Sequence, residues 1–292
     1  MTIKYGDSGR EAKRVQQALI AVGHPLPKYG ADGQMGTEGW TALEDYARAS
    51  GFDLGPNDEL DSDDPVPQLV ERLYTAHDAL IKAKPPAFPD VQYADLTERT
   101  GHHRHGYRPW SQIDAIVLHQ TGCAMPLSPG GWVLLRAHVG IPAANEQHIY
   151  LTNPLTSLMY HANAFNRRSV GIEISGNLRG IEGDNRTYWK PGKGPQIASE
   201  SQIKATRKAI AWICSEASRG GGKITHILSH RQASKDRIGD PGSLVWQEVG
   251  MWAMDELGLS DGGPDYKVGS GYRIPKEWCD REGYDGNSYW QR

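Results

Sequence analysis

Two histidines, each at the end of a short apolar run, are the residues of this chain best placed to do chemistry. Residues 113–118 lead into His119, and residues 225–229 lead into His230, with Asp240 following ten positions later. Runs of this length rich in Ile, Val and Leu favour buried strands, and open α/β sheets bind ligands at the carboxyl ends of their strands. Zinc accepts imidazole nitrogen and carboxylate oxygen, and a catalytic zinc keeps a fourth position for water. We therefore predict that His119, His230 and Asp240 hold one catalytic zinc ion.

A carboxylate in a third apolar run, Glu173, is the candidate for proton transfer. The run over residues 169–175 alternates, with Val170, Ile172 and Ile174 on one side, so Glu173 projects from the opposite side. A carboxylate in so apolar a strand is costly unless it is paired or its pKa is raised, and such groups serve as general acids or bases. The alternative is a Glu on an edge strand that faces solvent.

Other elements must form the walls around these residues. Residues 148–151 and 157–161 predict the two strands of a hairpin, which would carry His161 to the pocket. The loop over residues 176–198 is expected to form a wall of the cleft, with Asn177 near its start. Cys123 lies four residues after His119 and could ligate zinc, but a small buried thiol is the preferred interpretation.

Composition limits the class of protein. The chain has 292 residues, of which 38% are hydrophobic and 23% charged, and its net charge is −3. These values fit a soluble globular protein and give no support to nucleic-acid binding through bulk positive charge. Three widely spaced cysteines favour a reducing site of synthesis. The sequence shows no signal peptide and no run long enough to span a membrane, so we expect synthesis in the cytoplasm.

The chain is long enough for two hydrophobic cores. Residues 1–84 have apolar residues at helical spacing and predict a small all-helical domain. Residues 85–109 begin with a Pro-rich stretch and are expected to be a linker. Residues 110–260 predict the larger domain, in which Ser199 and Gln202 form a capping box for a long helix. Residues 261–292 are expected to be a C-terminal extension that packs on this larger domain.

The helical domain resembles the peptidoglycan-binding module that many cell-wall hydrolases carry. The matching motifs lie within residues 3–50: Gly6-Asp7-Ser8-Gly9, Val15-Gln16-Gln17-Ala18-Leu19, Gly23 and Asp32-Gly33-Gln34-Met35-Gly36-Thr37. The family usually has a Phe-Gln pair in its last helix, where this chain has Glu44-Asp45-Tyr46. The alternative is a structural helical unit without a ligand.

The larger domain resembles the zinc-dependent N-acetylmuramoyl-L-alanine amidases of type 2, whose fold peptidoglycan recognition proteins share. The matching motifs, between about residues 110 and 258, are Ile116-Val117-Leu118-His119-Gln120-Thr121, Tyr160-His161-Ala162, Ser169-Val170-Gly171-Ile172-Glu173-Ile174, and His230 with Asp240-Pro241-Gly242. The resemblance implies an α/β fold with a mixed central sheet flanked by helices. It also implies that His119, His230 and Asp240 are the zinc ligands.

Further residue roles follow from the same resemblance. Glu173 matches the glutamate that serves as the base in some members, and Gln147 stands where others have a Tyr. Many members have a Lys two residues before the last ligand, which stabilises the developing oxyanion. That position is Ile238 here, and the neighbouring Arg237 is the expected substitute. We expect His161, Gln147 and Asn177 to contact the substrate.

The implied function is hydrolysis of the amide bond between N-acetylmuramic acid and L-alanine in peptidoglycan. We expect a monomer that, like an endolysin, is made without a signal peptide and acts on the cell wall after release; a bacterial enzyme exported by another route is the alternative origin. A binding-only protein of the same fold and a muramidase, which needs two carboxylates, are the alternative functions. New amino termini in digested peptidoglycan would indicate an amidase, new reducing ends a muramidase, and neither a binder.

Overall fold

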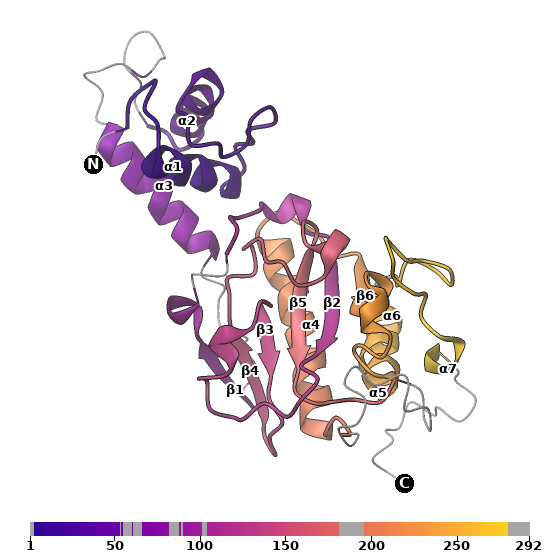
Figure 1. Cartoon of the computed structure of the whole chain (residues 1–292). Coiled ribbons are helices and arrows are strands. Elements are labelled where there is room, and N and C mark those ends of the chain that lie inside the picture. The colour runs from indigo at the N-terminus through magenta and orange to yellow at the C-terminus, as the bar shows by residue number, and fades with distance from the viewer. Residues whose placement is uncertain are drawn as a thin grey trace. The chain divides into compact units, whose positions relative to one another are not determined.

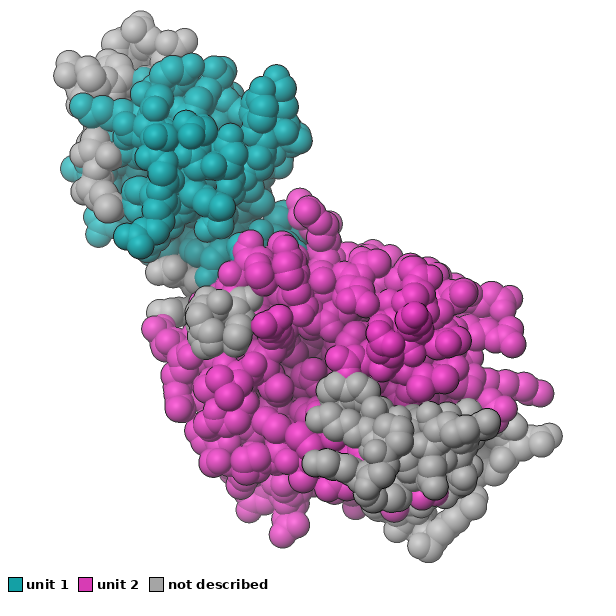
Figure 2. Space-filling view, in the orientation of Figure 1, with its two compact units in different colours: residues 1–83, 106–110 teal, residues 84–105, 111–292 magenta. Residues whose placement is uncertain are grey.

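The computed structural model describes residues 3–52, 54, 60, 66–81, 88, 90–100, 104–180 and 196–279. The chain forms two compact units, which are coloured separately in Figure 2. Unit 1 comprises residues 1–83 and 106–110, and unit 2 comprises residues 84–105 and 111–292. In the part of the chain that the structure describes, no helix is long and apolar enough to cross a lipid bilayer.

Unit 1 is helical and has its own apolar core. Its helices are α1 (Arg10–Ala21), α2 (Thr37–Ala49) and α3 (Val66–Ile81). The apolar positions predicted from helical spacing are fully buried, among them Val15, Leu19, Leu43, Leu69 and Leu73. This confirms the small all-helical domain that precedes the sheet.

Unit 2 is built on one mixed sheet of six strands. The strands are β1 (Val91–Asp95), β2 (Ala115–Gln120), β3 (Val139–Ile141), β4 (Gln147–Leu151), β5 (Ser169–Ile174) and β6 (His226–Ser229). They lie in the order β1-β4-β3-β5-β2-β6 (Figure 1). Only the β3–β4 pair is antiparallel; the other neighbours run parallel. The predicted α/β class with a mixed, helix-flanked sheet is confirmed.

The two faces of this sheet are covered differently. Helix α4 (Glu200–Arg219) packs against β3, β4 and β5, and in Figure 1 it lies behind the sheet. A continuous helical segment made of α5 (Ser243–Val245), a π-helical stretch (Trp246–Gly250) and α6 (Met251–Leu257) packs against α4 and β6. On the opposite face, apolar side chains of β2 and β6 pack against the loop that contains Phe165. This second face is the one from which His119 projects, because side chains alternate along a strand.

Two expectations about the sheet need correction. Residues 157–161 do not form a hairpin with β4, because β3 is the antiparallel partner of β4. The carbonyl of Ser157 instead accepts a hydrogen bond from His138, and that of Leu158 accepts one from the amide of His105. Residues 85–109, expected to be a linker, contain strand β1, which extends the sheet by pairing with β4.

The C-terminal segment contacts the rest of unit 2 as far as it is described. Helix α7 (Lys276–Cys279) contains Trp278, which is fully buried and donates a hydrogen bond from its indole to the carbonyl of Gly180. Tyr266 stacks on Phe165 with ring centroids 6.2 Å apart. Residues 181–195 of the expected cleft wall and residues 280–292 lie outside the described part of the chain.

Candidate active site

Strand register places His119 beside Glu173. Strands β2 and β5 run parallel, and His119 is the partner of Glu173 in their pairing. Partners in adjacent strands project from the same face of a sheet. Strand β6 pairs with the other side of β2 and ends at Ser229, so the next residue, His230, emerges at the same edge. Three neighbouring strands therefore deliver the two predicted imidazoles and the predicted base to one place.

The loop after β6 returns Asp240 to the same edge. Ser229 donates a hydrogen bond from its hydroxyl to the carbonyl oxygen of Asp240 (2.6 Å). The Asp240 carboxylate accepts a hydrogen bond from the backbone amide of Gln120 through Oδ1 (2.8 Å). Both the backbone and the side chain of Asp240 are thus fixed to the ends of β2 and β6.

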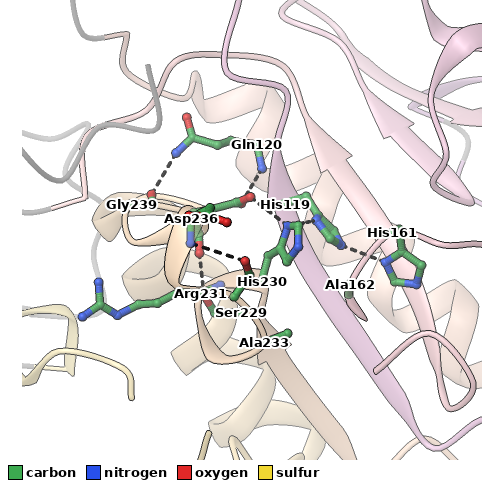
Figure 3. Close-up of polar contacts among 12 residues, drawn as sticks. His119, Gln120, His161, Ala162, Ser229, His230, Arg231, Ala233, Asp236 and Gly239 are labelled. Atoms are coloured by element: carbon green, nitrogen blue, oxygen red, sulfur yellow. Dashed lines mark hydrogen bonds and ion pairs between the residues drawn. The ribbon is translucent and has the colours of Figure 1, made fainter. Parts of the chain in front are cut away.

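His119 is central to a chain of polar contacts that links the site residues. Its Nδ1 lies 2.9 Å from Nδ1 of His230, which in turn lies 3.1 Å from Oδ2 of Asp240. Its other ring nitrogen, Nε2, lies 2.9 Å from Nδ1 of His161. Figure 3 shows His119 between His230 and His161. The structure thus brings together all three predicted metal ligands, and it adds His161 on the far side of His119.

The donor set fits a zinc ion. One ligand atom from each of His119, His230 and Asp240 lies within 4.8 Å of the others, and all three residues are buried. At a zinc–ligand distance of about 2.0–2.1 Å, neighbouring ligand atoms of a tetrahedral site lie about 3.3 Å apart. The separations His119 Nδ1–His230 Nδ1 (2.9 Å) and His230 Nδ1–Asp240 Oδ2 (3.1 Å) are close to that spacing. Two imidazoles and one carboxylate also leave one coordination position for water or substrate, as catalytic zinc sites require.

Burial keeps His119 neutral, which is the form that ligates a metal. The pKa of His119 is lowered well below 6.5, first by burial and then by the neighbouring His230 and His161. If Nε2 of His119 carries the proton and donates a hydrogen bond to Nδ1 of His161, the lone pair on Nδ1 of His119 is directed towards His230 and Asp240. Outer partners of this kind fix the tautomer of a metal-binding histidine.

Glu173 is a partly buried residue, and one oxygen of its carboxyl group is held out of water. Burial raises its pKa well above the usual value, the charge of Asp240 raises it further, and the charge of Arg237 lowers it. Its Oε2 atom is inaccessible to solvent and has no hydrogen-bond partner among the described residues. A buried polar atom without a partner normally requires an explanation, such as a ligand or a catalytic role. Glu173 therefore has the environment of a general base or acid.

Arg237 lies close enough to act on both neighbours through its charge. Its guanidinium lowers the pKa of His119 as well as that of Glu173. It ends the short 3₁₀ turn Lys235–Arg237 in the loop between His230 and Asp240. The structure thus places a positive charge at the site, although the position two residues before Asp240 holds Ile238.

His161 is positioned by residues that sequence patterns did not identify. Its backbone amide and that of Ala162 donate to Oδ1 of Asn166 (2.9 and 2.7 Å). Its ring crosses the backbone of β5 at Gly171, where an added Cβ would lie 2.6 Å from Nδ1 of His161. Any side chain at Gly171 would therefore displace the imidazole that contacts His119.

Gln120 is a second residue that sequence reasoning missed. It is buried, and its side-chain amide donates to the carbonyl oxygens of Leu178 (3.0 Å) and Gly239 (2.8 Å). Its Oε1 accepts from the amide of Leu178. One side chain thereby joins the loop after β5 to the loop that carries Asp240, as Figure 3 shows for Gly239. These partners lie 58 and 119 residues away in sequence, so no local pattern could identify them.

Other predicted residues are not among the three candidate metal ligands. Gln147 begins β4, which is separated from β2 by β3 and β5, so three strand spacings of about 4.8 Å intervene. Its amide donates to Asp90 (2.9 Å). Asn177 is buried, and its backbone amide donates to Gln196. Cys123 is partly buried and does not belong to the cluster of candidate ligands.

Comparison with known proteins agrees with the sequence resemblance. Residues 109–243 match the family model described as N-acetylmuramoyl-L-alanine amidase. A curated relative, a probable N-acetylmuramoyl-L-alanine amidase of Bacillus licheniformis, is 33% identical over 90 residues. That match covers 29% of this chain and a quarter (25%) of the length of the relative.

Two solved structures resemble part of this chain at low sequence identity. The endolysin amidase LysCS of Clostridium intestinale is 16% identical, with a TM-score of 0.39 over 60% of this chain and 100% of that chain. The peptidoglycan recognition protein PGRP-LB of Drosophila is 15% identical, with a TM-score of 0.38 over 56% of this chain and 93% of that chain. Residues 109–243, just under half of the chain, match the N-acetylmuramoyl-L-alanine amidase family model and contain the motifs that carry the site.

Proposed function

We propose that this protein is a zinc-dependent peptidoglycan amidase. It cleaves the amide bond that joins the lactyl group of N-acetylmuramic acid to L-alanine of the stem peptide. The observation that carries the proposal is the meeting of His119, His230 and Asp240 at the edge of β2 and β6, beside Glu173. The family match of residues 109–243 supports the reaction class.

His119, His230 and Asp240 would hold one zinc ion. Zinc in such a site polarises the scissile carbonyl and lowers the pKa of a coordinated water towards about 7. His161 holds His119 in one orientation, and the Gln120 amide holds the carboxylate of Asp240. The protein thereby supplies a set of ligands that is ordered by its own hydrogen bonds.

Glu173 is the proton carrier of the proposed reaction. Its raised pKa allows it to accept a proton from the attacking water and then to return it to the leaving nitrogen of L-alanine. Arg237 provides positive charge near the developing oxyanion, in the role that a Lys at position 238 would serve. The expected contact of His161 with substrate is replaced in this proposal by its contact with His119, and Gln147 and Asn177 remain candidates for more distant parts of the substrate.

Digestion of purified peptidoglycan tests the proposed reaction. An amidase releases stem peptides with new L-alanine amino termini and creates no new reducing ends. The zinc-loaded protein should produce such termini, and treatment with a chelator should stop their release. New reducing ends without new amino termini would instead support a muramidase, and no release of either would support a protein that only binds.

Unit 1 is proposed to hold the enzyme on its polymeric substrate at the cell wall, with the whole chain acting as a monomer. It has a separate apolar core and exposes Tyr5 and Tyr29, which are 60% and 59% accessible. Co-sedimentation of the catalytically inactive chain with purified cell walls tests this role. Binding that persists after unit 2 is saturated with soluble muropeptide would support it, and complete loss of binding would contradict it.

A further inference from the structure

We infer that Arg231 is the positioning residue through which the C-terminal segment, residues 261–279, holds the loop of candidate metal ligands. Arg231 directly follows His230 and is 9% exposed, and Figure 3 shows its side chain extending away from the histidines. Its guanidinium donates from Nε to the carbonyl oxygen of Arg273 (2.7 Å) and from Nη1 to that of Ile238. One side chain therefore joins the turn after β6, the later part of the metal-ligand loop and the C-terminal segment.

Two aromatic rings of the C-terminal segment contact the same guanidinium. The guanidinium carbon of Arg231 lies 5.4 Å from the ring centroid of Tyr272 and 5.5 Å from that of Trp278. Trp278 is fully buried and donates a hydrogen bond to the carbonyl of Gly180, so its ring is fixed. A planar guanidinium combines stacking on aromatic rings with directed hydrogen bonds, and a lysine ammonium cannot reproduce this combination. The contact is therefore specific for arginine.

The backbone of the C-terminal segment also pairs with the turn after β6. The amide of Tyr272 donates to the carbonyl oxygen of Arg231 (2.9 Å). The amide of Val268 donates to the carbonyl oxygen of Gln232 (2.9 Å). At Gly271 the two backbones approach so closely that an added Cβ would lie 2.0 Å from the Gln232 carbonyl oxygen. The turn and the segment are thus joined by main-chain contacts as well as by the Arg231 side chain.

Gln232 provides a further side-chain link between the turn and the segment. It is fully buried, and its Nε2 donates to the carbonyl oxygens of Asp261 (2.9 Å) and Tyr266 (3.2 Å). Its Oε1 accepts a hydrogen bond from the amide of Ser229, the last residue of β6 (2.9 Å). The end of β6 is therefore connected to the C-terminal segment directly before the first ligand of the loop.

These contacts act on the loop between His230 and Asp240. The backbone amide of Arg231 donates to the carbonyl oxygen of Asp240 (3.2 Å), and Ile238, held by the guanidinium, lies two residues before Asp240. A site binds its metal more tightly when its ligands are already held in place. The inference rests on the proposed metal centre: by fixing both ends of the loop, Arg231 sets the separation of His230 and Asp240. The C-terminal segment lies outside residues 109–243, which match the amidase family model.

Zinc titration of the metal-free, full-length protein tests this role through Arg231→Lys, which keeps the positive charge and removes the planar guanidinium. In competition with a chromogenic chelator, we expect this variant to bind zinc about 10- to 100-fold more weakly, the usual effect of losing a residue that orients metal ligands. Tyr272→Leu removes one stacked ring from a residue that is 42% exposed, so the protein should stay folded and bind zinc about threefold more weakly.

Arg207→Lys is the matched control, because Arg207 makes the same kinds of contact on α4. It donates to the carbonyl oxygen (2.7 Å) and the carboxylate (2.8 Å) of Glu248, and its guanidinium lies 5.5 Å from the Trp252 ring centroid. Its replacement should lower stability in denaturant unfolding and leave zinc affinity within about twofold of the original chain. Unchanged zinc affinity in Arg231→Lys would overturn the inference, as would an equal loss in Arg207→Lys. If Arg231→Lys did not fold, unchanged affinity in Tyr272→Leu would overturn it.

Hydrogen exchange of the metal-free protein distinguishes failure of this inference from failure of the metal centre. Measured by mass spectrometry, the amides of residues 229–241 should exchange about tenfold faster in Arg231→Lys and at the original rate in Arg207→Lys. If the original chain bound no zinc, the proposed metal centre would fail and the exchange rates would decide alone. Faster exchange confined to Arg231→Lys would then support the positioning role, and unchanged exchange would overturn it.

Discussion

At the scale of single residues, the site depends on Glu173, a partly buried residue with one carboxyl oxygen held out of water. Glu173 is opposite His119 in the strand register, and its Oε2 atom lacks a partner among the described residues. The same strand could have held an apolar side chain at lower cost, since a buried charge is unfavourable unless it is paired. The cost is understandable if the position serves proton transfer.

Replacing Glu173 by Gln should abolish most activity without reducing stability. We expect kcat to fall by about 10²- to 10⁴-fold, the usual contribution of a general acid–base group. Because folding raises the pKa of Glu173 above 4.5, the folded state of the metal-free protein loses stability as pH rises from 4.5 through the folded pKa. The Gln variant lacks this loss, so its unfolding temperature at pH 8 should equal or exceed that of the original chain. A clearly lower unfolding temperature would contradict the account of burial.

Arg237 should control the pH at which Glu173 works. Its positive charge lowers the pKa of Glu173, so Arg237→Met should raise that pKa and move the acid limb of the kcat/KM profile to higher pH. It should also reduce kcat by about 10- to 10³-fold if the guanidinium stabilises the oxyanion. Arg237→Lys is the matched control and should keep the acid limb near its original position. An unshifted profile in Arg237→Met would show that the charge does not reach the reacting groups.

At the scale of elements, the sheet positions the site through register and through close approach of its backbone. Strands β2, β5 and β6 end at one edge, and His119, Glu173 and His230 lie at or just after those ends. Gly171 allows the His161 ring to cross β5 directly over the backbone. The contact between His161 and His119 thus depends on the absence of a side chain at Gly171.

Gly171→Ala should disturb the site although it adds only one methyl group. The new Cβ would lie 2.6 Å from Nδ1 of His161, so the imidazole or the strand must move. We expect a loss of about 1–3 kcal/mol in the free energy of unfolding, as for other overpacked sites, and at least a tenfold lower zinc affinity through the lost contact to His119. Denaturant unfolding and zinc titration measure the two effects. Gly130→Ala is the control, since nothing lies within 4 Å of its added Cβ; equal behaviour of the two variants would refute the steric argument.

Local patterns predicted the elements that depend on neighbouring residues. The alternation around Glu173 places Val170, Ile172 and Ile174 in the core, where all three are fully buried. Ser199 and Gln202 form the predicted capping box at the start of α4. These features could be predicted because periodicity and capping are local.

The missed features depend on partners that are distant in sequence. Residues 157–161 have the composition of a strand, but the edge of β4 that they would occupy is taken by β3. His138 is fixed by Gly171 and Ser157, and Gln120 is fixed by Leu178 and Gly239. Neither pairing follows from a local pattern, so neither positioning residue could be identified before the fold was known.

At the scale of the whole molecule, each compact unit has its own core. Unit 1 packs its three helices around apolar residues such as Leu19 and Leu43. Unit 2 contains the complete candidate site, with contributions from β2, β5, β6 and the loop to Asp240. All groups needed for the proposed reaction are therefore within one unit.

Zinc should stabilise the folded chain if its ligands converge only in the folded state. An ion that binds only the folded protein adds about 4.1 kcal/mol at a concentration 1,000 times its dissociation constant. We expect zinc to raise the unfolding temperature of the metal-free protein, because the unfolded chain does not hold these ligands together. Magnesium is the control, because it prefers oxygen ligands. Equal effects of magnesium and zinc would contradict a site made of two imidazoles and one carboxylate.

The most direct test of the account is the zinc content of the purified chain, measured alongside the release of amino termini from peptidoglycan, in the original protein and in His119→Ala. We predict one tightly held zinc ion per original chain with amidase activity, and loss of both in the variant while the protein remains folded. A folded His119→Ala protein that retained its zinc and its full activity would contradict the proposed metal centre.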